Sequence, residues 1–119
     1  MVTKEMLALS VATLDKKKAF DIKVLKIDDL TVLTEYFVIA NATSNTHVHS
    51  LADEVEEVLK ENGVVTSHIV GRSSGWMCMD YGSVIIHIFT PDQRIFYNLD
   101  GMWADGKEID IKEFIEEEK

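Results

Sequence analysis

Apolar residues recur along the chain at two different spacings, and these spacings predict where its helices and strands lie. Two segments repeat apolar residues at helical spacing: residues 4–17, and the segment between residues 44 and 63. Ser44 or Asn45 can cap the start of the second helix, and Gly63 can end it. The apolar positions are Leu7, Ala8, Val11 and Leu14 in the first helix and Val48, Leu51, Ala52, Val55, Val58 and Leu59 in the second.

Strands are predicted where apolar residues alternate with polar ones or form short continuous runs. Residues 20–27 begin with such alternation, and residues 35–40 form a nearly continuous apolar run that is typical of a strand covered on both faces. A tight turn at Tyr81 and Gly82 joins the last two strands, because glycine adopts a positive φ without a Cβ clash. The predicted strands are residues 20–27, 35–40, 64–70, 75–80 and 83–89.

A further helix is predicted to begin at Thr90. Thr90 can serve as its N-cap, Pro91 fits the first helical position, and Gln93 completes a capping box. Gly106 ends this helix or lies just beyond its end. The residues predicted to form its buried stripe are Ile95, Leu99, Met102 and Trp103.

The resulting order, α-β-β-α-β-β-β-α, predicts an α/β (α+β) fold in which a mixed sheet has helices mainly on one face. The other face would be covered only in part, so it is a natural place for a partner or a second copy. We expect a single domain over residues 1–106 and a partly docked acidic tail over residues 107–119, frayed in its last four residues. The tail residues expected to dock are Ile109, Ile111, Phe114 and Ile115.

Composition indicates a small soluble protein. The 119 residues fit one domain, and 46% of them are hydrophobic, enough for a core. The chain shows neither a signal peptide nor a run of roughly 18 apolar residues that could span a membrane. The single cysteine, Cys78, excludes an internal disulfide. We therefore expect a cytoplasmic protein with no membrane association.

The charge of the chain bears on what it binds. Its 21 acidic and 12 basic residues give a formal net charge of −9. Phosphate binding relies on Lys and Arg, so direct nucleic-acid binding over a broad surface is not expected. A basic protein partner fits better, because the opposite electric fields of the two proteins guide them together. A role in solubility alone would explain the acidity equally well.

Residue types that carry catalysis are present, but not in catalytic patterns. Ser44 and Ser50 lie near His47 and His49 without a G-x-S-x-G motif, and histidines two positions apart on a helix point in different directions. His87 lies inside an apolar strand. We interpret it as a core or sheet-face histidine with a hydrogen-bond partner, and a functional interface histidine is the alternative.

Other candidates for a catalytic or metal site are equally weak. Residues 71–75 have glycine at both ends but lack the phosphate-loop pattern, so we interpret them as a mobile loop. No pair of acids follows a strand in the arrangement that two metal ions need. Cys78 has no cationic neighbour in sequence that would activate its thiol, so we interpret it as a packing residue. We therefore expect no catalytic residue, no metal site and no cofactor.

The strand before the tight turn carries the clearest binding signal. In a strand its side chains alternate between faces, with Trp76, Cys78 and Asp80 on one face and Met77 and Met79 on the other. If the methionines pack against the helices, Trp76 projects from the less covered face, close to Tyr81. Aromatic residues in such a place are favoured anchors of protein interfaces, and an ordinary core position is the alternative for Trp76.

Two stretches of the sequence together resemble a known family. The stretch GWMCMDYGSVIIHIFTPDQRIFYNLDGMW contains a Trp, a short apolar strand, an Asp-x-Gly turn and a strand with a central His, then Arg, Tyr and a Leu-acid-x-x-Trp ending. The upstream stretch KKKAFDIKVLKIDDLTVLTEYFVIANATSNTHVHSLADEV leads from a lysine-rich helix end into an Asp-Ile strand and a Tyr-Phe-Val-Ile strand. Over about residues 7–105, this order and spacing resembles the ribosomal silencing factor (Iojap-like) family.

The resemblance implies a fold related to nucleotidyltransferases without their catalytic site. It also implies a non-enzymatic protein that binds a basic protein of the large ribosomal subunit, L14 (uL14). The contact would lie where the small subunit must dock, so subunit joining and translation would be repressed.

The resemblance also implies which residues contact the partner. Trp76 and Tyr81 match contact positions, and Asp80 would supply turn geometry or a charge for the basic partner. Cys78 and Ser83 are further candidates. Four positions depart from the family pattern, and the departure at Ser83, where an acid is common, removes one possible salt bridge. The other three departures are Glu35, Val70 and Asp100.

Two other functions remain open from the sequence. The implied fold would also suit a nucleotidyltransferase-like, nucleotide-binding enzyme. The partly open sheet face would suit a homodimeric scaffold. A weak homodimer is compatible with ribosome binding if it hides the surface that the ribosome later uses.

Overall fold

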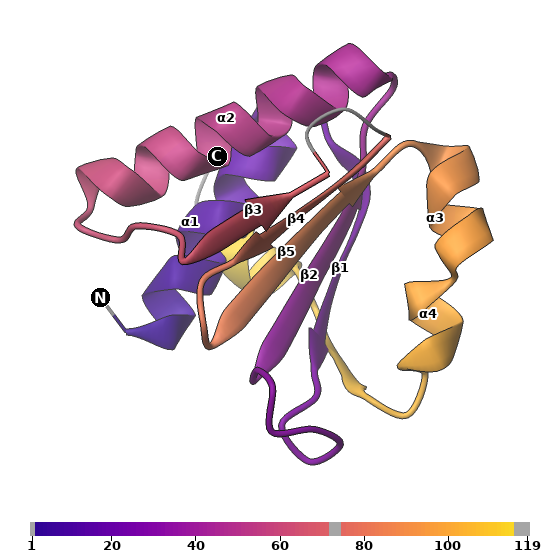
Figure 1. The fold of residues 1–119 in the computed structure, drawn as a ribbon. Coiled ribbons are helices and arrows are strands. Elements are labelled where there is room, and N and C mark those ends of the chain that lie inside the picture. The colour runs from indigo at the N-terminus through magenta and orange to yellow at the C-terminus, as the bar shows by residue number, and fades with distance from the viewer. Residues whose placement is uncertain (1, 72–74, 116–119) are drawn as a thin grey trace.

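The computed structural model describes residues 2–71 and 75–115, in which six strands form one mixed sheet with helices on both of its faces (Figure 1). The helices are α1 (Thr3–Lys16), α2 (Asn45–Glu61), α3 (Pro91–Tyr97), α4 (Leu99–Met102) and α5 (Lys112–Ile115). The strands are β1 (Phe20–Lys26), β2 (Tyr36–Asn41), β3 (His68–Val70), β4 (Trp76–Asp80), β5 (Val84–Phe89) and β6 (Lys107–Ile109).

The strand order in the sheet is β3-β4-β5-β2-β1-β6. The central pair, β2 and β5, is parallel, and the other neighbouring strands are antiparallel. The connection from β2 to β5 passes through α2 and the β3–β4 hairpin, as parallel neighbours need a long crossover. The predicted mixed sheet is therefore confirmed, and β2 is buried at every position, as its apolar run indicated.

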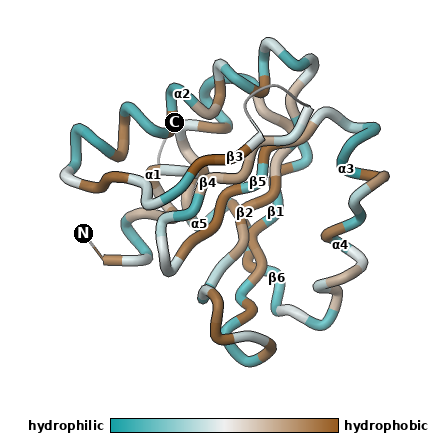
Figure 2. The backbone as a smooth tube through the Cα atoms, in the orientation of Figure 1, coloured by the Kyte–Doolittle hydropathy of each residue, from teal (hydrophilic) through white to brown (hydrophobic). Residues whose placement is uncertain are grey.

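The main core lies between the sheet and the layer formed by α1, α2 and α5. The predicted stripes of the two long helices are buried there, with Val11, Leu14, Val48 and Val55 each at 0% exposure. Ser44 caps α2, because its hydroxyl accepts a hydrogen bond from the backbone N–H of His47 at 3.1 Å. In Figure 2, hydrophobic colour is concentrated in the strands, whereas α2 alternates between hydrophilic and hydrophobic residues.

A smaller apolar cluster lies on the opposite face of the sheet, beneath α3 and α4. Its buried members come from β1, the β1–β2 loop, β2 and β5, and Leu99 and Trp103 pack against them from the helices. The Trp103 ring meets the Phe37 ring edge to face, with centroids 5.3 Å apart. The buried members are Leu25, Ile27, Phe37, Ile39 and Phe89.

The single helix predicted after Thr90 is wrong, because the chain forms two short helices there. Asn98 adopts a left-handed backbone conformation with φ of 52° and separates α3 from α4. Of the predicted buried stripe, Ile95 and Met102 are 79% and 68% exposed, whereas Leu99 and Trp103 pack against the smaller apolar cluster. Thr90 precedes Pro91 as the N-cap residue, but its side chain makes no cap hydrogen bond, so the predicted capping box is absent from this described segment.

The strand predicted at residues 64–70 is shortened to β3. Before it, the hydroxyl of Thr66 and the backbone N–H of Ser67 both donate to the carbonyl oxygen of Asp80, at 2.8 and 2.9 Å. Side-chain and turn hydrogen bonds thus replace a regular ladder at this end of the hairpin. Residues 72–74 of the predicted loop lie outside the described residues.

The C-terminal segment extends the sheet. β6 pairs antiparallel with β1, with Ile109 opposite Val24 and Lys107 opposite Lys26. Beyond it, Phe114 is 7% exposed and belongs to the main core, with Ile111 and Ile115 packed against the same cluster. The four residues predicted to fray, 116–119, lie outside the described residues.

Candidate functional site

Strand β4 divides its side chains between the two faces of the sheet as its sequence predicts. Met77 and Met79 are buried in the main core, at 1% and 0% exposure. Trp76, Cys78 and Asp80 lie on the face that carries α3 and α4, and each is partly exposed. This face is therefore the less completely covered one along β4.

Trp76 is held in one orientation by its neighbours. Its indole N–H donates a hydrogen bond to Nδ1 of His87 at 3.1 Å. Its ring stacks on Phe89, with centroids 5.3 Å apart and planes at 15°, and contacts the Tyr97 ring at 4.4 Å. We call Trp76, His87, Phe89 and Tyr97 the aromatic cluster. A partly exposed tryptophan fixed in this way needs little further ordering on binding.

His87 supports the cluster from inside the sheet. It is 5% exposed, and burial lowers its pKa to about 4, so the imidazole is neutral at physiological pH. Because Nδ1 accepts the hydrogen bond from Trp76, the proton of the neutral ring is on Nε2. The interpretation of His87 as a sheet-face histidine with a hydrogen-bond partner is confirmed.

Sequence reasoning missed the aromatic residues that extend the cluster onto α3. Tyr97 is 40% exposed and its neighbour Phe96 is 76% exposed, with the two ring centroids 5.1 Å apart. Both residues fall outside the predicted buried stripe of this helix. Two adjacent aromatic residues outside a buried stripe indicate an exposed aromatic surface, and this was the sequence signal that could have identified them. With Trp76 they form a continuous, partly exposed aromatic surface.

Tyr81 does not lie beside Trp76, which corrects the placement expected from sequence. It is 9% exposed and packs in the main core on the opposite face of the sheet. Burial, with a smaller contribution from Glu56, raises the pKa of its hydroxyl to about 12. The reason is that the alternation of β4 continues into the turn, so residue 81 follows Met77 and Met79 rather than Trp76.

Asp80 and Ser83 shape the turn between β4 and β5. A carboxylate oxygen of Asp80 accepts a hydrogen bond from the backbone N–H of Gly82 at 2.8 Å, and Gly82 has a φ of +83°. The Ser83 hydroxyl accepts a hydrogen bond from Thr3 at 2.9 Å. These two candidates therefore lie at the end of β4 and β5 that is remote from Trp76, which begins β4.

Cys78 lies between Val70 and His87 in the register of the sheet. Burial, and secondarily the charge of Asp80, raises the pKa of its thiol to about 11. The thiol is therefore protonated at neutral pH and is a poor nucleophile. This agrees with its interpretation as a packing residue that borders the partly exposed face.

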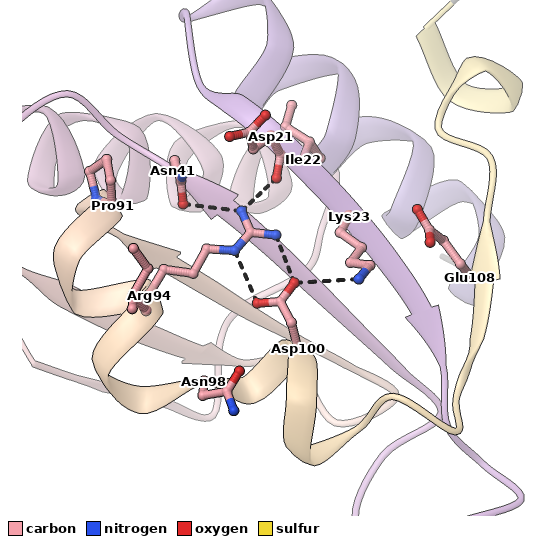
Figure 3. Close-up of a pocket in the computed structure, with 10 residues that line it drawn as sticks. Asp21, Ile22, Lys23, Asn41, Pro91, Arg94, Asn98, Asp100 and Glu108 are labelled. Atoms are coloured by element: carbon pink, nitrogen blue, oxygen red, sulfur yellow. Dashed lines mark hydrogen bonds and ion pairs between the residues drawn. The ribbon is translucent and has the colours of Figure 1, made fainter.

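Arg94 fastens α3 and α4 to the sheet (Figure 3). Its guanidinium donates to both carboxylate oxygens of Asp100, at 3.1 and 2.9 Å, and also to the Asn41 side chain at 3.1 Å and the Asp21 carbonyl at 2.6 Å. Lys23 adds a longer contact of 3.5 Å to Asp100. These interactions, first of all the hydrogen bonds from Arg94, lower the pKa of the Asp100 carboxyl. We call Arg94, Asp100, Asn41, Asp21 and Lys23 the Arg94 cluster; it fastens α4 and also α3, which carries Tyr97.

A hollow of about 620 Å³ surrounds this Arg94 cluster, between α3 and β1. The sticks in Figure 3 show Arg94, Asp100 and Lys23 pointing toward one another within it. Arg94, Lys23 and Asp100 thus bind one another, which gives this part of the hollow a structural role. Within residues 2–71 and 75–115, no three His, Cys, Asp or Glu side chains come together in a group that could hold a metal ion.

Among the described helices, none is both long and apolar enough to cross a membrane.

Comparison with known proteins identifies the family. The chain matches the family described as "Ribosomal silencing factor during starvation" over residues 2–119. It is 31% identical over 112 residues to the ribosomal silencing factor RsfS of Bacillus subtilis, covering 93% of this chain and 95% of that protein. It is also 31% identical over 98 residues to the mouse protein named "Mitochondrial assembly of ribosomal large subunit protein 1", covering 79% of this chain and 43% of that protein.

A solved structure agrees with this assignment. The crystal structure of a protein from Chromobacterium violaceum superposes with a TM-score of 0.85 at 32% identity and covers 92% of each chain. A second, from Bacillus halodurans, gives a TM-score of 0.80 at 28% identity, covering 91% of this chain and 99% of that one. Sequence and fold together show that this chain belongs to the ribosomal silencing factor family.

Proposed function

We propose that this protein binds the large ribosomal subunit through its basic protein L14 (uL14) and blocks joining with the small subunit, which represses translation. Its family membership and the names of its relatives, which refer to ribosome silencing and large-subunit assembly, support this function. On this proposal the protein is a non-enzymatic, cytoplasmic regulator that needs no cofactor.

The observation that carries the proposal is the fixed, partly exposed ring of Trp76. Stacking on Phe89 and the hydrogen bond to His87 hold the indole on the face that α1 and α2 leave uncovered. Tryptophan and tyrosine are the residue types most often found at the energetic centre of protein interfaces. Phe96 and Tyr97 on α3 widen this anchor.

Charge supports a basic partner for the same face. The chain has a net charge of −9, and Asp80 follows Trp76 and Cys78 along the same face of β4. A basic ribosomal protein would be attracted to this surface before contact is made. Among the residues expected from sequence, we retain Trp76, Cys78 and Asp80 as contact residues and Ser83 as a neighbour at the turn. Tyr81 would act from beneath, by supporting the turn.

A weak homodimer is a second use that we propose for the same surface. The exposed apolar residues of α3 and α4, including Ile95, Phe96 and Met102, favour self-association when no ribosome is present. Light scattering over a range of protein concentrations tests this: a concentration-independent monomer mass would rule the dimer out.

Co-sedimentation with purified large subunits tests the main proposal. We expect the wild-type protein to bind, and Trp76→Ala to bind at least about tenfold more weakly. The matched control is Val65→Ala, which truncates a 76% exposed apolar side chain between α2 and β3. Circular dichroism must show that both variants are folded.

The outcomes separate the function from the site. Loss of binding by folded Trp76→Ala alone supports both. Equal binding by all three proteins means that the function stands and the aromatic cluster is not the contact. A wild-type protein that never travels with large subunits refutes the proposed function. Isolated L14 in the same assay then tests whether that protein is the partner.

A further inference from the structure

The loop between β1 and β2 presents large apolar side chains to solvent. Val32 is fully exposed, at 101%, and Leu33 and Leu30 are 75% and 45% exposed. In Figure 2 this loop, at the lower end of the view, carries hydrophobic colour beyond the ends of the strands. The loop belongs to neither of the two apolar clusters that stabilise the fold, except through Ile27 at its base.

The backbone of this loop is held in place by hydrogen bonds. Ile27 N–H donates to the Glu35 carbonyl at 2.8 Å, which closes the loop at its base. The N–H groups of Leu30 and Thr31 donate to the Ile27 carbonyl, and that of Leu33 donates to the Thr31 hydroxyl. The exposed side chains are therefore presented by an ordered turn, so binding through them costs less conformational entropy.

A groove runs between this loop and the β4–β5 turn. It has a volume of about 460 Å³, and its lining includes Val32 and Leu33 on one side and Gly82 and Ser83 on the other. The Ser83 carbonyl accepts a hydrogen bond from the Glu35 N–H at 3.1 Å, which ties the two walls together. The groove is large enough to take one apolar side chain of a partner beside the loop tip.

The surroundings of the groove are acidic. Residues 26–36 contain three carboxylates and a single lysine, Lys26, and both oxygens of Asp28 lie 2.8 Å from the Lys26 ammonium. The other two carboxylates, Asp29 and Glu35, are on exposed residues. Phosphate groups of lipids or RNA would be repelled here, whereas Lys or Arg side chains would be attracted.

We propose that this groove and the loop tip are a second contact with the large ribosomal subunit and receive a basic protein segment that also carries an apolar side chain. The apolar side chain packs between Val32 and Leu33, while its Lys or Arg neighbours pair with Asp29 and Glu35. This inference rests on the proposed function and extends its interface. The first contact lies at Trp76, where β4 begins, and the groove lies beside the turn that follows Asp80, where β4 ends. These two ends of β4 are about 13 Å apart, so one interface of ordinary size covers both contacts.

The test is the affinity of the full chain for purified large subunits, measured by sedimentation at low and moderate salt. We expect the double variant Val32→Ser/Leu33→Ser to bind about tenfold more weakly than wild type. These side chains are exposed, so urea unfolding should show unchanged stability. The matched control is Val65→Ser, which removes an equally exposed apolar side chain before β3, three strands away from β2.

A charge variant tests the polar half of the proposal. Asp29→Asn/Glu35→Gln should bind more weakly at low salt and should approach the wild-type affinity as salt is raised, because screening removes the attraction that these carboxylates supply.

Three results would overturn the inference. Equal affinity of the wild type and the Val32→Ser/Leu33→Ser variant removes the second contact and leaves the proposed function intact. No binding of wild-type protein to large subunits removes the proposed function and this inference with it. Flotation of wild-type protein with phosphatidylcholine vesicles, lost in the loop variant, would assign the apolar tip to a membrane instead of a protein.

Discussion

Trp76 and His87 form a diagonal pair across β4 and β5, because Trp76 lies opposite Phe89 and Cys78 lies opposite His87 in the register. The indole N–H donates to the imidazole along this diagonal at 3.1 Å. The partly exposed indole of β4 is thereby bonded to a histidine that is almost fully buried. A substitution at either residue should therefore remove a hydrogen bond from the other.

The stability of the fold should fall as the pH is lowered from neutral toward 4. The pKa of His87 is lowered by burial from 6.5 to about 4, so between these values the unfolded chain binds a proton at this position and the folded chain does not. Stability is therefore full above pH 6.5 and declines below it, by about 3 kcal/mol at pH 4. Urea unfolding at pH 7.5 and at pH 4.5 measures the decline.

The control for this pH dependence is His87→Gln, which cannot titrate. It should be less stable at pH 7.5 but should lose much less stability between pH 7.5 and 4.5 than wild type. The lowered pKa of the Asp100 carboxyl acts in a different window, since its stabilisation is lost only as the pH falls below about 4. Parallel curves for wild type and His87→Gln would contradict the assignment to His87.

Trp76→Phe should destabilise the protein although it keeps an aromatic ring. The substitution removes the donor to His87 Nδ1 and leaves a buried acceptor without its hydrogen bond, which costs about 1–3 kcal/mol. A double-mutant cycle with His87→Phe measures the coupling in urea unfolding. A coupling energy near zero would show that the hydrogen bond does not contribute to stability.

Arg94→Lys should loosen α3 and α4 even though it conserves the charge. A lysine cannot reproduce the forked contact with Asp100 together with the bonds to Asn41 and the Asp21 carbonyl. We expect a loss of about 1–3 kcal/mol in the free energy of unfolding. Hydrogen exchange should quicken in residues 91–102, while protection in α2 changes much less. Uniform loss of protection would instead indicate global destabilisation.

Two glycines with similar backbone angles should respond differently to alanine. Gly71 and Gly82 have φ of +89° and +83°. A Cβ at Gly71 would clash with the carbonyl oxygen of Trp76, whereas at Gly82 it would meet nothing within 4 Å. Gly82→Ala should therefore lower the free energy of unfolding by roughly 1 kcal/mol, which is the cost of holding an alanine in the left-handed conformation. Gly71→Ala should cost clearly more in thermal unfolding, and equal losses would contradict the described position of Trp76.

Sequence periodicity predicted most of the fold because the long elements have regular patterns. The stripes of α1 and α2, the buried run of β2 and the alternation of β4 each depend on local spacing that burial enforces. The break at Asn98 was not predicted in this way, because apolar spacing does not report a single residue in the left-handed conformation. The contacts of Arg94 that fasten α3 and α4 to the sheet were not predicted either. Those contacts join residues that are far apart in the sequence, such as Asp21 and Asp100.

The candidate site was predicted in part for the same reason. Alternation in β4 placed Trp76, Cys78 and Asp80 on one face, and the structure agrees. Tyr81 was expected near Trp76 because it lies at the turn, whereas the alternation of β4 continues through residue 81 and places it in the main core. Tyr97 was missed because its contact with Trp76 depends on where α3 crosses the sheet, which no local pattern in the sequence specifies.

The pairing of β6 with β1 has a consequence for the order in which the protein is made. β6 and α5 follow every other described element during synthesis, yet they cover β1 and the Leu7 side of α1, which are among the first elements made. Until residues 107–115 leave the ribosome, a nascent chain carries an unpaired edge on β1 and a partly uncovered first helix. Completion of the native fold therefore has to wait for this late segment.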